Sequence, residues 1–163
     1  RVLCPNHARR PMNTETPTPP ADAPVQIMPR VPTREHIEAL EREMLKHPQL
    51  PIRTTHHFAA GLYAREIYIP AGTLLTGKIH STEHLNIISK GEIQVWTEDG
   101  MKKVRAPFTL ISRPGTKRIG LAVTDTVWTT IHANPENTRD LDRLESLLIL
   151  APTLTKGETP CLG

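Results

Sequence analysis

Residues 69–93, IPAGTLLTGKIHSTEHLNIISKGEI, carry the pattern that decides the fold. Two runs rich in apolar and β-branched residues flank a polar Ser-Thr-Glu connection, and Pro and Gly residues bound the pair. Because residues two apart in a strand share a face, Lys78 and His80 are expected to point the same way. The stretch therefore predicts a β-turn-β unit on the wall of a barrel, with His84 opening its second strand.

The same pattern of short strand-like runs separated by turn residues extends from residue 54 to residue 132. Apolar and β-branched runs alternate with Gly, Pro and Asp breakers about every eight to twelve residues, and Asp99-Gly100 is a strong hairpin signal. The expected strands are 55–60, 62–69, 73–79, 84–89, 92–97, 102–105, 108–112, 118–124 and 126–132. Many short strands with no helices between them predict an all-β, antiparallel sandwich or barrel.

A helix is expected on each side of this β region. Residues 33–47 have apolar side chains at helical spacing, and Thr33 is a good N-cap for them. Residues 138–149 carry a stripe of leucines, with Asn137 or Thr138 as the expected cap. Both helices need apolar surface to pack against.

The ends of the chain differ in composition from its middle. Eight of the 16 prolines fall in residues 1–32, which hold few large apolar residues to offset the entropy of ordering. We expect a flexible Pro-rich arm there, a single domain over 33–150 and a loose tail over 151–163. Because Met12 is the first methionine, residues 1–11 are interpreted as sequence that need not be native.

Charge and cysteine content exclude several classes of protein. Lys and Arg total 20 against 17 Asp and Glu, and the net charge of +3 is weak for a nucleic-acid-binding protein. Cys4 and Cys161 lie in the expected arm and tail, so we expect neither a disulfide framework nor secretion. No apolar run approaches the roughly 20 residues of a membrane span. We therefore expect no membrane partner and no nucleic-acid partner.

One basic run stands out between residues 100 and 124, which contain no acidic residue. Its members are Lys102, Lys103, Arg105, Arg113, Lys117 and Arg118. No interleaved aromatic residues or nucleic-acid motif accompany them. We expect a solvated or partner-facing sheet edge, where cations prevent unwanted strand pairing.

The β region resembles the cupin family, also called RmlC-like jelly rolls. The first cupin motif runs Gly, five residues, His-x-His, three or four residues, Glu, six residues, Gly. Here Gly72, Lys78, His80, His84 and Gly91 stand at the same spacing, and the flanking Ile-Pro-Ala-Gly and Gly-Glu-Ile phrases are also typical. The resemblance covers about half of the chain and implies an antiparallel jelly-roll barrel with one helix on each side.

Two cations stand where this family places metal ligands. Lys78 replaces the first His and His84 replaces the Glu. When the second motif is aligned on Gly115, Arg118 stands at the position of its His, so His80 alone keeps the usual residue type. Lys and Arg offer hydrogen-bond donors rather than lone pairs, and their charge favours an anion.

The first of three interpretations of this pocket is a shifted metal site. His80, His84 and His132, with Glu83 or His57 nearby, would hold a divalent metal such as Zn, Fe, Ni or Mn. Neutral imidazoles are common ligands for these metals.

The second interpretation is an anion pocket. Its expected lining residues are Lys78, Arg118, Asn86 and Trp128. In the third interpretation the pocket is vestigial and holds no cofactor and no catalytic residue. Both cations would then pair with carboxylates such as Glu66 or Glu83, and the histidines would be satisfied structural residues.

Further phrases, among them Tyr63-Ala64-Arg65-Glu66 and Val127-Trp128-Thr129-Thr130, are similar to small cupins carried by tailed bacteriophages. This resemblance implies a non-enzymatic homo-oligomer, a homodimer or larger, that serves as a virion structural or assembly component. Capsid decoration, capsid cementing and an accessory role are the expected forms, with a major capsid protein as a partner and the host cytoplasm or the virion as the location. The alternatives are a metal-dependent isomerase or dioxygenase acting on a small anionic substrate, and a small-molecule-binding regulator.

Overall fold

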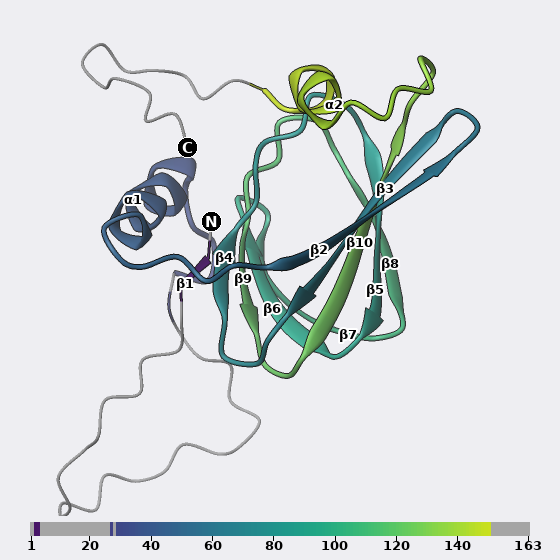
Figure 1. The fold of residues 1–163 in the computed structure, drawn as a ribbon. Helices are drawn as coiled ribbons and strands as arrows, with labels where there is room; N and C mark the ends of the chain where they lie inside the picture. The colour runs from purple at the N-terminus through teal and green to yellow at the C-terminus, as the bar shows by residue number, and fades with distance from the viewer. Residues whose placement is uncertain (1, 4–26, 28, 151–163) are drawn as a thin grey trace, which may run out of the picture.

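The structure, a computed structural model, describes residues 2–3, 27 and 29–150. These residues form two five-stranded antiparallel sheets packed face to face, with one helix beside the barrel and another across one end of it (Figure 1). The all-β, antiparallel jelly roll with flanking helices is thereby confirmed. The expected tail and most of the expected Pro-rich arm lie outside the described residues. Within that arm Val2–Leu3 form a short strand paired with Leu74 and Leu75, which differs from the flexible segment that the sequence predicts.

The secondary structure follows the expected alternation closely. In chain order the elements are β1 (Val2–Leu3), α1 (Arg34–Met44), β2 (Arg53–Ala59), β3 (Leu62–Ile69), β4 (Leu74–Thr76), β5 (His84–Lys90), β6 (Glu92–Thr97), β7 (Gly100–Arg105), β8 (Phe108–Ser112), β9 (Ile119–Ala122), β10 (Thr126–Ala133) and α2 (Leu141–Leu148). The strand order is β1-β4-β9-β6-β7 in the first sheet and β2-β3-β10-β5-β8 in the second. Each sheet therefore combines strands that are distant in sequence.

The core lies between the two sheets. Ile69 and Ile88 from the second sheet pack with Ile93 and Val95 from the first, and all four are buried. In β5 burial alternates along the strand, because successive side chains point to opposite faces. This alternation turns His84, Asn86 and Ile88 of β5 toward the inside of the barrel.

Helix α1 packs against the first sheet. Ile37 is fully buried and lies in one cluster with Trp96 of β6 and Ile119 of β9. The expected cap is present: the Thr33 side chain accepts a hydrogen bond from the backbone N–H of His36, and the His36 ring accepts one in return from the backbone N–H of Thr33. The helix thus begins where the sequence predicts and buries its apolar face.

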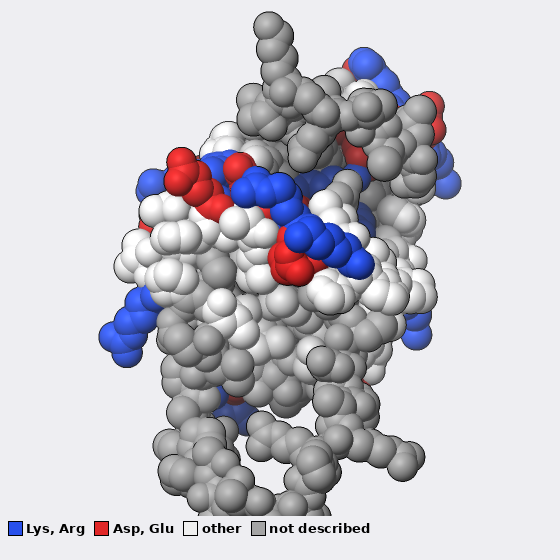
Figure 2. All heavy atoms as spheres, turned by 90° about the vertical axis from the view of Figure 1, so that its left-hand side faces the viewer, with Lys and Arg blue, Asp and Glu red and all other residues white. Residues whose placement is uncertain are grey.

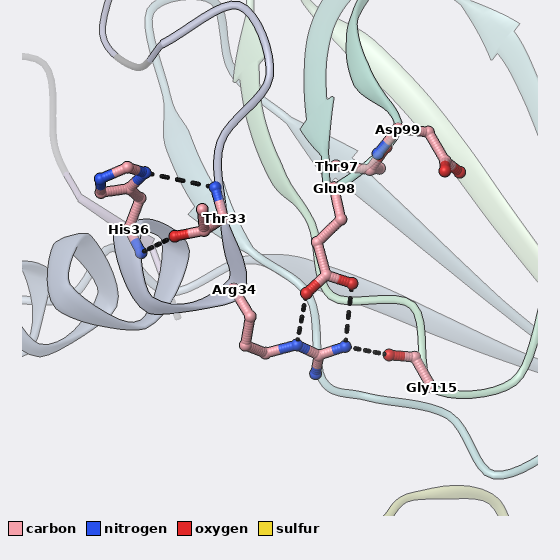
Figure 3. A network of polar contacts seen from close by, with 7 residues as sticks. All are labelled: Thr33, Arg34, His36, Thr97, Glu98, Asp99 and Gly115. Carbon is pink, nitrogen blue, oxygen red and sulfur yellow. Dashed lines mark hydrogen bonds and ion pairs between the residues drawn. The ribbon is translucent and has the colours of Figure 1, made fainter.

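A polar contact also ties the start of α1 to the barrel (Figure 3). The guanidinium of Arg34 donates to both carboxylate oxygens of Glu98, at 2.9 and 3.2 Å, and to the carbonyl oxygen of Gly115 at 2.7 Å. Glu98 lies in the β6–β7 turn and Gly115 lies in the loop before β9. One side chain therefore joins the helix to two loops at one end of the barrel.

The basic run between residues 100 and 124 does not form one surface. Lys102, Lys103 and Arg105 lie on β7, an edge strand, as expected. Lys117 does not: only 6% of its side chain is exposed, and it forms an ion pair with Glu41 of α1. On the face shown in Figure 2, Lys and Arg side chains lie beside Asp and Glu side chains, so this face carries no extended patch of one sign.

Helix α2 begins later than the sequence predicts. Its N-cap is Asp140, whose carboxylate accepts from the backbone N–H groups of Asp142 and Arg143, and not Asn137 or Thr138. Asn137 has a φ of 52° and instead accepts a hydrogen bond from the backbone N–H of Gly61 at 2.7 Å. A carboxylate also suits the positive end of a helix better than a neutral amide.

Helix α2 covers one end of the barrel (Figure 1). Its buried Leu144 and Leu148 pack with Tyr63 of β3. Neither helix in the described part of the chain has the length and apolar character that crossing a membrane requires.

Candidate functional site

Three histidines from different parts of the chain meet inside the barrel. Ile131 of β10 pairs with Leu85 of β5, so the next residues, His132 and His84, lie side by side on adjacent strands. His80 lies in the segment between β4 and β5, where its backbone forms a bridge with Ile149 at the end of α2. The two sheet strands and the end of the helix therefore position the three rings together.

The three imidazoles are close enough to share one ligand. Their ring centres are 4.2 Å apart for His80 and His84, 4.5 Å for His84 and His132, and 4.8 Å for His80 and His132. One nitrogen from each ring lies within 4.8 Å of the others. A tetrahedral metal with bonds of about 2.0–2.1 Å separates its ligand nitrogens by about 3.3 Å. The three nitrogens would have to move closer to one another by about 1.5 Å or less to hold such a metal.

The environment keeps these imidazoles neutral at pH 7. Burial, together with the nearby histidines and the charge of Arg118, lowers the pKa of His80 to about 3. Burial beside His84 lowers the pKa of His132 to about 4. Burial and the charge of Arg118 also lower the pKa of His84, although its hydrogen bond to the Thr82 carbonyl acts in the opposite direction. Neutral imidazoles have the lone pair that a metal requires.

The hydrogen bonds around two of the rings fit metal coordination. Nδ1 of His84 lies 3.1 Å from the carbonyl oxygen of Thr82. When Nδ1–H donates to that carbonyl, Nε2 keeps its lone pair, which is the usual arrangement of a metal-bound histidine. Nδ1 of His132 is buried and has no hydrogen-bond partner among the described residues. A buried nitrogen without a partner is costly in a structural histidine and expected in a ligand. The three histidines therefore fit a divalent transition metal.

Beside the histidines, a hydrogen-bonded chain orients a buried guanidinium. The indole N–H of Trp128 donates to Oδ1 of Asn86 at 2.9 Å, and Nδ2 of Asn86 donates to Oγ of Ser112 at 2.7 Å. Ser112 Oγ also accepts a hydrogen bond from Nη2 of Arg118. The Arg118 guanidinium lies 5.7 Å from the centre of the Trp128 ring, within the range of a cation–π contact.

Lys78 and Arg118, the two cations expected in the pocket, have different environments. The expected strand over 73–79 is shorter than predicted, because β4 ends at Thr76. Lys78 follows that end, has a side chain that is 61% exposed, and pairs with Glu145 of α2, not with Glu66 or Glu83. In the described chain Arg118 has no carboxylate partner, and burial lowers its pKa to about 10, so it stays charged at pH 7.

A cavity of about 370 Å³ joins these groups. All three histidines, Lys78, Asn86, Arg118 and Trp128 line it. Much of the remaining wall is apolar and comes from both sheets and from α2; it includes Ile67, Leu75, Ile93, Val95, Leu144 and Leu148. The volume falls in the lower part of the roughly 300–1,000 Å³ range of small-molecule sites.

The cavity excludes two residues named as nearby ligands, and two residues that the sequence did not single out contact the side chains that line it. Glu83 and His57 are exposed and do not line it. Ser112 joins Asn86 to Arg118, and Glu145 neutralises Lys78 at the wall. No local sequence pattern indicates either role. The role of Ser112 depends on the β5–β8 pairing, and the role of Glu145 depends on where α2 lies.

The chain is similar to solved cupin structures. A cupin-2 domain-containing protein from Shewanella frigidimarina is 11% identical, with a TM-score of 0.43 over 59% of this chain and 92% of that one. An RmlC-like cupin with a double-stranded β-helix fold from Methanocaldococcus jannaschii is 14% identical, with a TM-score of 0.42 over 52% of this chain and 84% of that one.

A third solved structure, from Photorhabdus luminescens, is 17% identical, with a TM-score of 0.47 over 58% of this chain and 85% of that one. No protein-family model and no curated protein matches the sequence. Identities this low carry no information on activity, which must be argued from the site itself.

Proposed function

We propose that the chain binds a divalent transition metal through His80, His84 and His132, and that a small molecule enters the same cavity to meet it. The observation that carries this proposal is the convergence of three neutral imidazoles, one of which has a buried nitrogen without a hydrogen-bond partner in the described chain.

The site has the features of a reactive centre rather than of a closed structural one. Three protein ligands leave further coordination positions open, whereas structural zinc sites use four. The bound metal would supply a Lewis acid that polarises an oxygen of the small molecule. The chain's own groups would orient that molecule between the apolar wall and the Arg118 side.

Metal titration of EDTA-treated protein tests the proposal. Calorimetry and thermal unfolding with Zn, Ni, Mn and Fe(II) should give about one metal per chain for at least one of them. A hundredfold excess over the dissociation constant stabilises the folded state by about 2.7 kcal/mol. His132→Gln should abolish the binding, whereas His57→Gln, an exposed histidine outside the cavity, should leave it unchanged. Equal effects of the two substitutions, or no uptake of any of the four metals, would refute the metal site.

The expected homo-oligomer stays a prediction that one surface feature supports. Leu85 of β5 and Ile111 of β8 pair with each other and are 43% and 63% exposed. Strand β8 forms an edge of its sheet, and two such edges can meet in a symmetric dimer. Analytical ultracentrifugation should then show a dimer that Ile111→Lys dissociates, and a monomeric wild type would end this prediction. The expected place in a bacteriophage virion stays a prediction as well.

A further inference from the structure

We propose that Arg118 anchors the carboxylate of a small organic acid whose apolar body fills the rest of the cavity. The inference rests on the proposed function, because it names the class of molecule that enters the same cavity. It adds a recognition residue and a required charge, neither of which the three histidines supply.

The first argument is an uncompensated charge. Among the described residues, no Asp or Glu lies within ion-pair distance of Arg118, and Ser112 is the only hydrogen-bond partner of its guanidinium. A guanidinium has five N–H donors, so four are left without a partner in that part of the chain. A half-buried charge without a counter-charge is unfavourable, because part of its hydration is lost. A bound anion would remove that cost.

The second argument is that the guanidinium is already oriented for binding. Ser112 Oγ accepts a hydrogen bond from Nη2, and Cζ of the guanidinium lies 5.7 Å from the centre of the Trp128 ring. Ser112 is itself fixed by Asn86, which Trp128 holds through its indole N–H. A planar guanidinium held in this way matches the two oxygens of a carboxylate, which it can bind through parallel hydrogen bonds. Little conformational entropy would remain to be lost on binding.

The third argument is the position of this charge relative to the histidines. Arg118 lines the same cavity as His80 and His84. The cavity wall that remains is largely apolar. A molecule that fits must therefore carry a charged group at one end and an apolar body at the other.

The fourth argument is charge balance, which favours a monoanion. The other cations of the wall are compensated or solvated, since Lys78 is paired with Glu145 and Arg65 is exposed. One buried guanidinium balances one negative charge, as a carboxylate has, rather than the two of a phosphate monoester. A neutral amide of the same shape would leave the guanidinium unpaired and should be rejected.

Calorimetry with matched acids and amides tests the inference. The probes are propanoate, 4-methylpentanoate and phenylacetate, their three primary amides, and phenyl phosphate, each titrated into metal-free and zinc-loaded protein. We expect at least one carboxylate to bind at least tenfold more tightly than its amide and than phenyl phosphate. Arg118→Met should remove this preference, and Arg118→Lys, which keeps the charge but not the planar fork, should weaken it.

Arg113→Met is the matched control, since Arg113 is exposed, lies five residues earlier and does not line the cavity. It should leave the carboxylate preference intact, and circular dichroism should show each variant folded. A carboxylate affinity that survives in Arg118→Met, equal affinities for acid and amide, or tighter binding of phenyl phosphate would overturn the inference. Zinc uptake without carboxylate preference would refute Arg118 as the anchor and leave the metal site standing. Carboxylate preference without zinc uptake would support Arg118 as the anchor and count against a zinc site.

Discussion

The ammonium group of Lys117 lies 2.7 Å from a carboxylate oxygen of Glu41, and this ion pair joins helix α1 to the barrel. Both partners have further contacts: Lys117 donates to the carbonyl oxygen of Gly77 at 3.0 Å, and Glu41 accepts from the hydroxyl of Thr76 at 2.8 Å. Burial alone would raise the pKa of Glu41, but the hydrogen bonds and the charge of Lys117 outweigh it and hold that pKa below its usual value. The Glu41 carboxylate is therefore ionised at neutral pH.

Glu41→Gln should destabilise the fold, because it leaves an ammonium group with 6% exposure unpaired. Breaking a buried pair from one side costs about 3–5 kcal/mol, and the partial exposure of Glu41 favours the lower end, about 3 kcal/mol. Urea unfolding measures the change. Combining Glu41→Gln with Lys117→Met should recover part of the loss, and strictly additive losses would contradict the coupling.

Gly91 lies between β5 and β6 for a steric reason that can be tested. Its φ is 87°, and a Cβ atom there would lie 2.2 Å from the backbone oxygen of Asp125. Gly91→Ala should therefore lower the free energy of unfolding by more than about 3 kcal/mol, since both the backbone conformation and the contact become strained. Gly61→Ala is the control: its φ is 72°, but nothing lies within 4 Å of the added atom, so only about 1 kcal/mol is expected. Similar losses in urea unfolding would rule out this steric reason.

Most of the fold could be predicted because it depends on local pattern. Gly61, Gly72 and Gly91 all adopt positive φ, which other residues rarely do, and each interrupts the chain between apolar runs. Alternation within the runs then decides which side chains face the core. The boundaries that were predicted wrongly belong to short elements, as at the end of β4 and the start of α2.

The site was less accessible to sequence reasoning because it depends on long-range packing. Lys117 and Arg118 are adjacent and chemically alike, yet one is paired with α1 and the other faces the cavity with no acid beside it. Spacing identified His80, His84 and His132 as candidates, since they lie in or next to expected strands that a small barrel brings together. No pattern indicated Ser112 or Glu145, whose partners lie 26 and 67 positions away.

The metal-free protein should lose stability as the pH falls below 6.5. His80 and His132 have pKa values of about 3 and about 4 in the folded protein, against about 6.5 when unfolded. Below pH 6.5 the unfolded chain binds protons that the folded chain excludes, so the free energy of unfolding falls by up to about 1.4 kcal/mol per pH unit for each histidine. This loss begins near pH 6.5 and continues toward pH 4 and then 3.

Urea unfolding of EDTA-treated protein at pH 7.5, 6.5 and 5.5 measures this dependence before the carboxylates titrate. The double variant His80→Gln and His132→Gln should show a flatter profile than the wild type. The variant His57→Gln, which alters an exposed histidine, should keep the wild-type slope. Parallel profiles for wild type and the double variant would mean that these two imidazoles are not held neutral by the fold.

Arg118→Met should stabilise the protein while removing the carboxylate preference. The substitution replaces a half-buried guanidinium that has no carboxylate partner in the described chain with a shorter apolar side chain, and Ser112 keeps its hydrogen bond from Asn86. Replacing buried charge with apolar packing often raises stability by about 1–4 kcal/mol, and we expect a gain near the lower end, measured by urea unfolding. Arg113→Met, on an exposed site, should change stability by less than about 0.5 kcal/mol. A residue that serves to bind a ligand is expected to destabilise the protein when the ligand is absent. If Arg118→Met instead lowers the free energy of unfolding by more than about 1 kcal/mol, the guanidinium supports the fold.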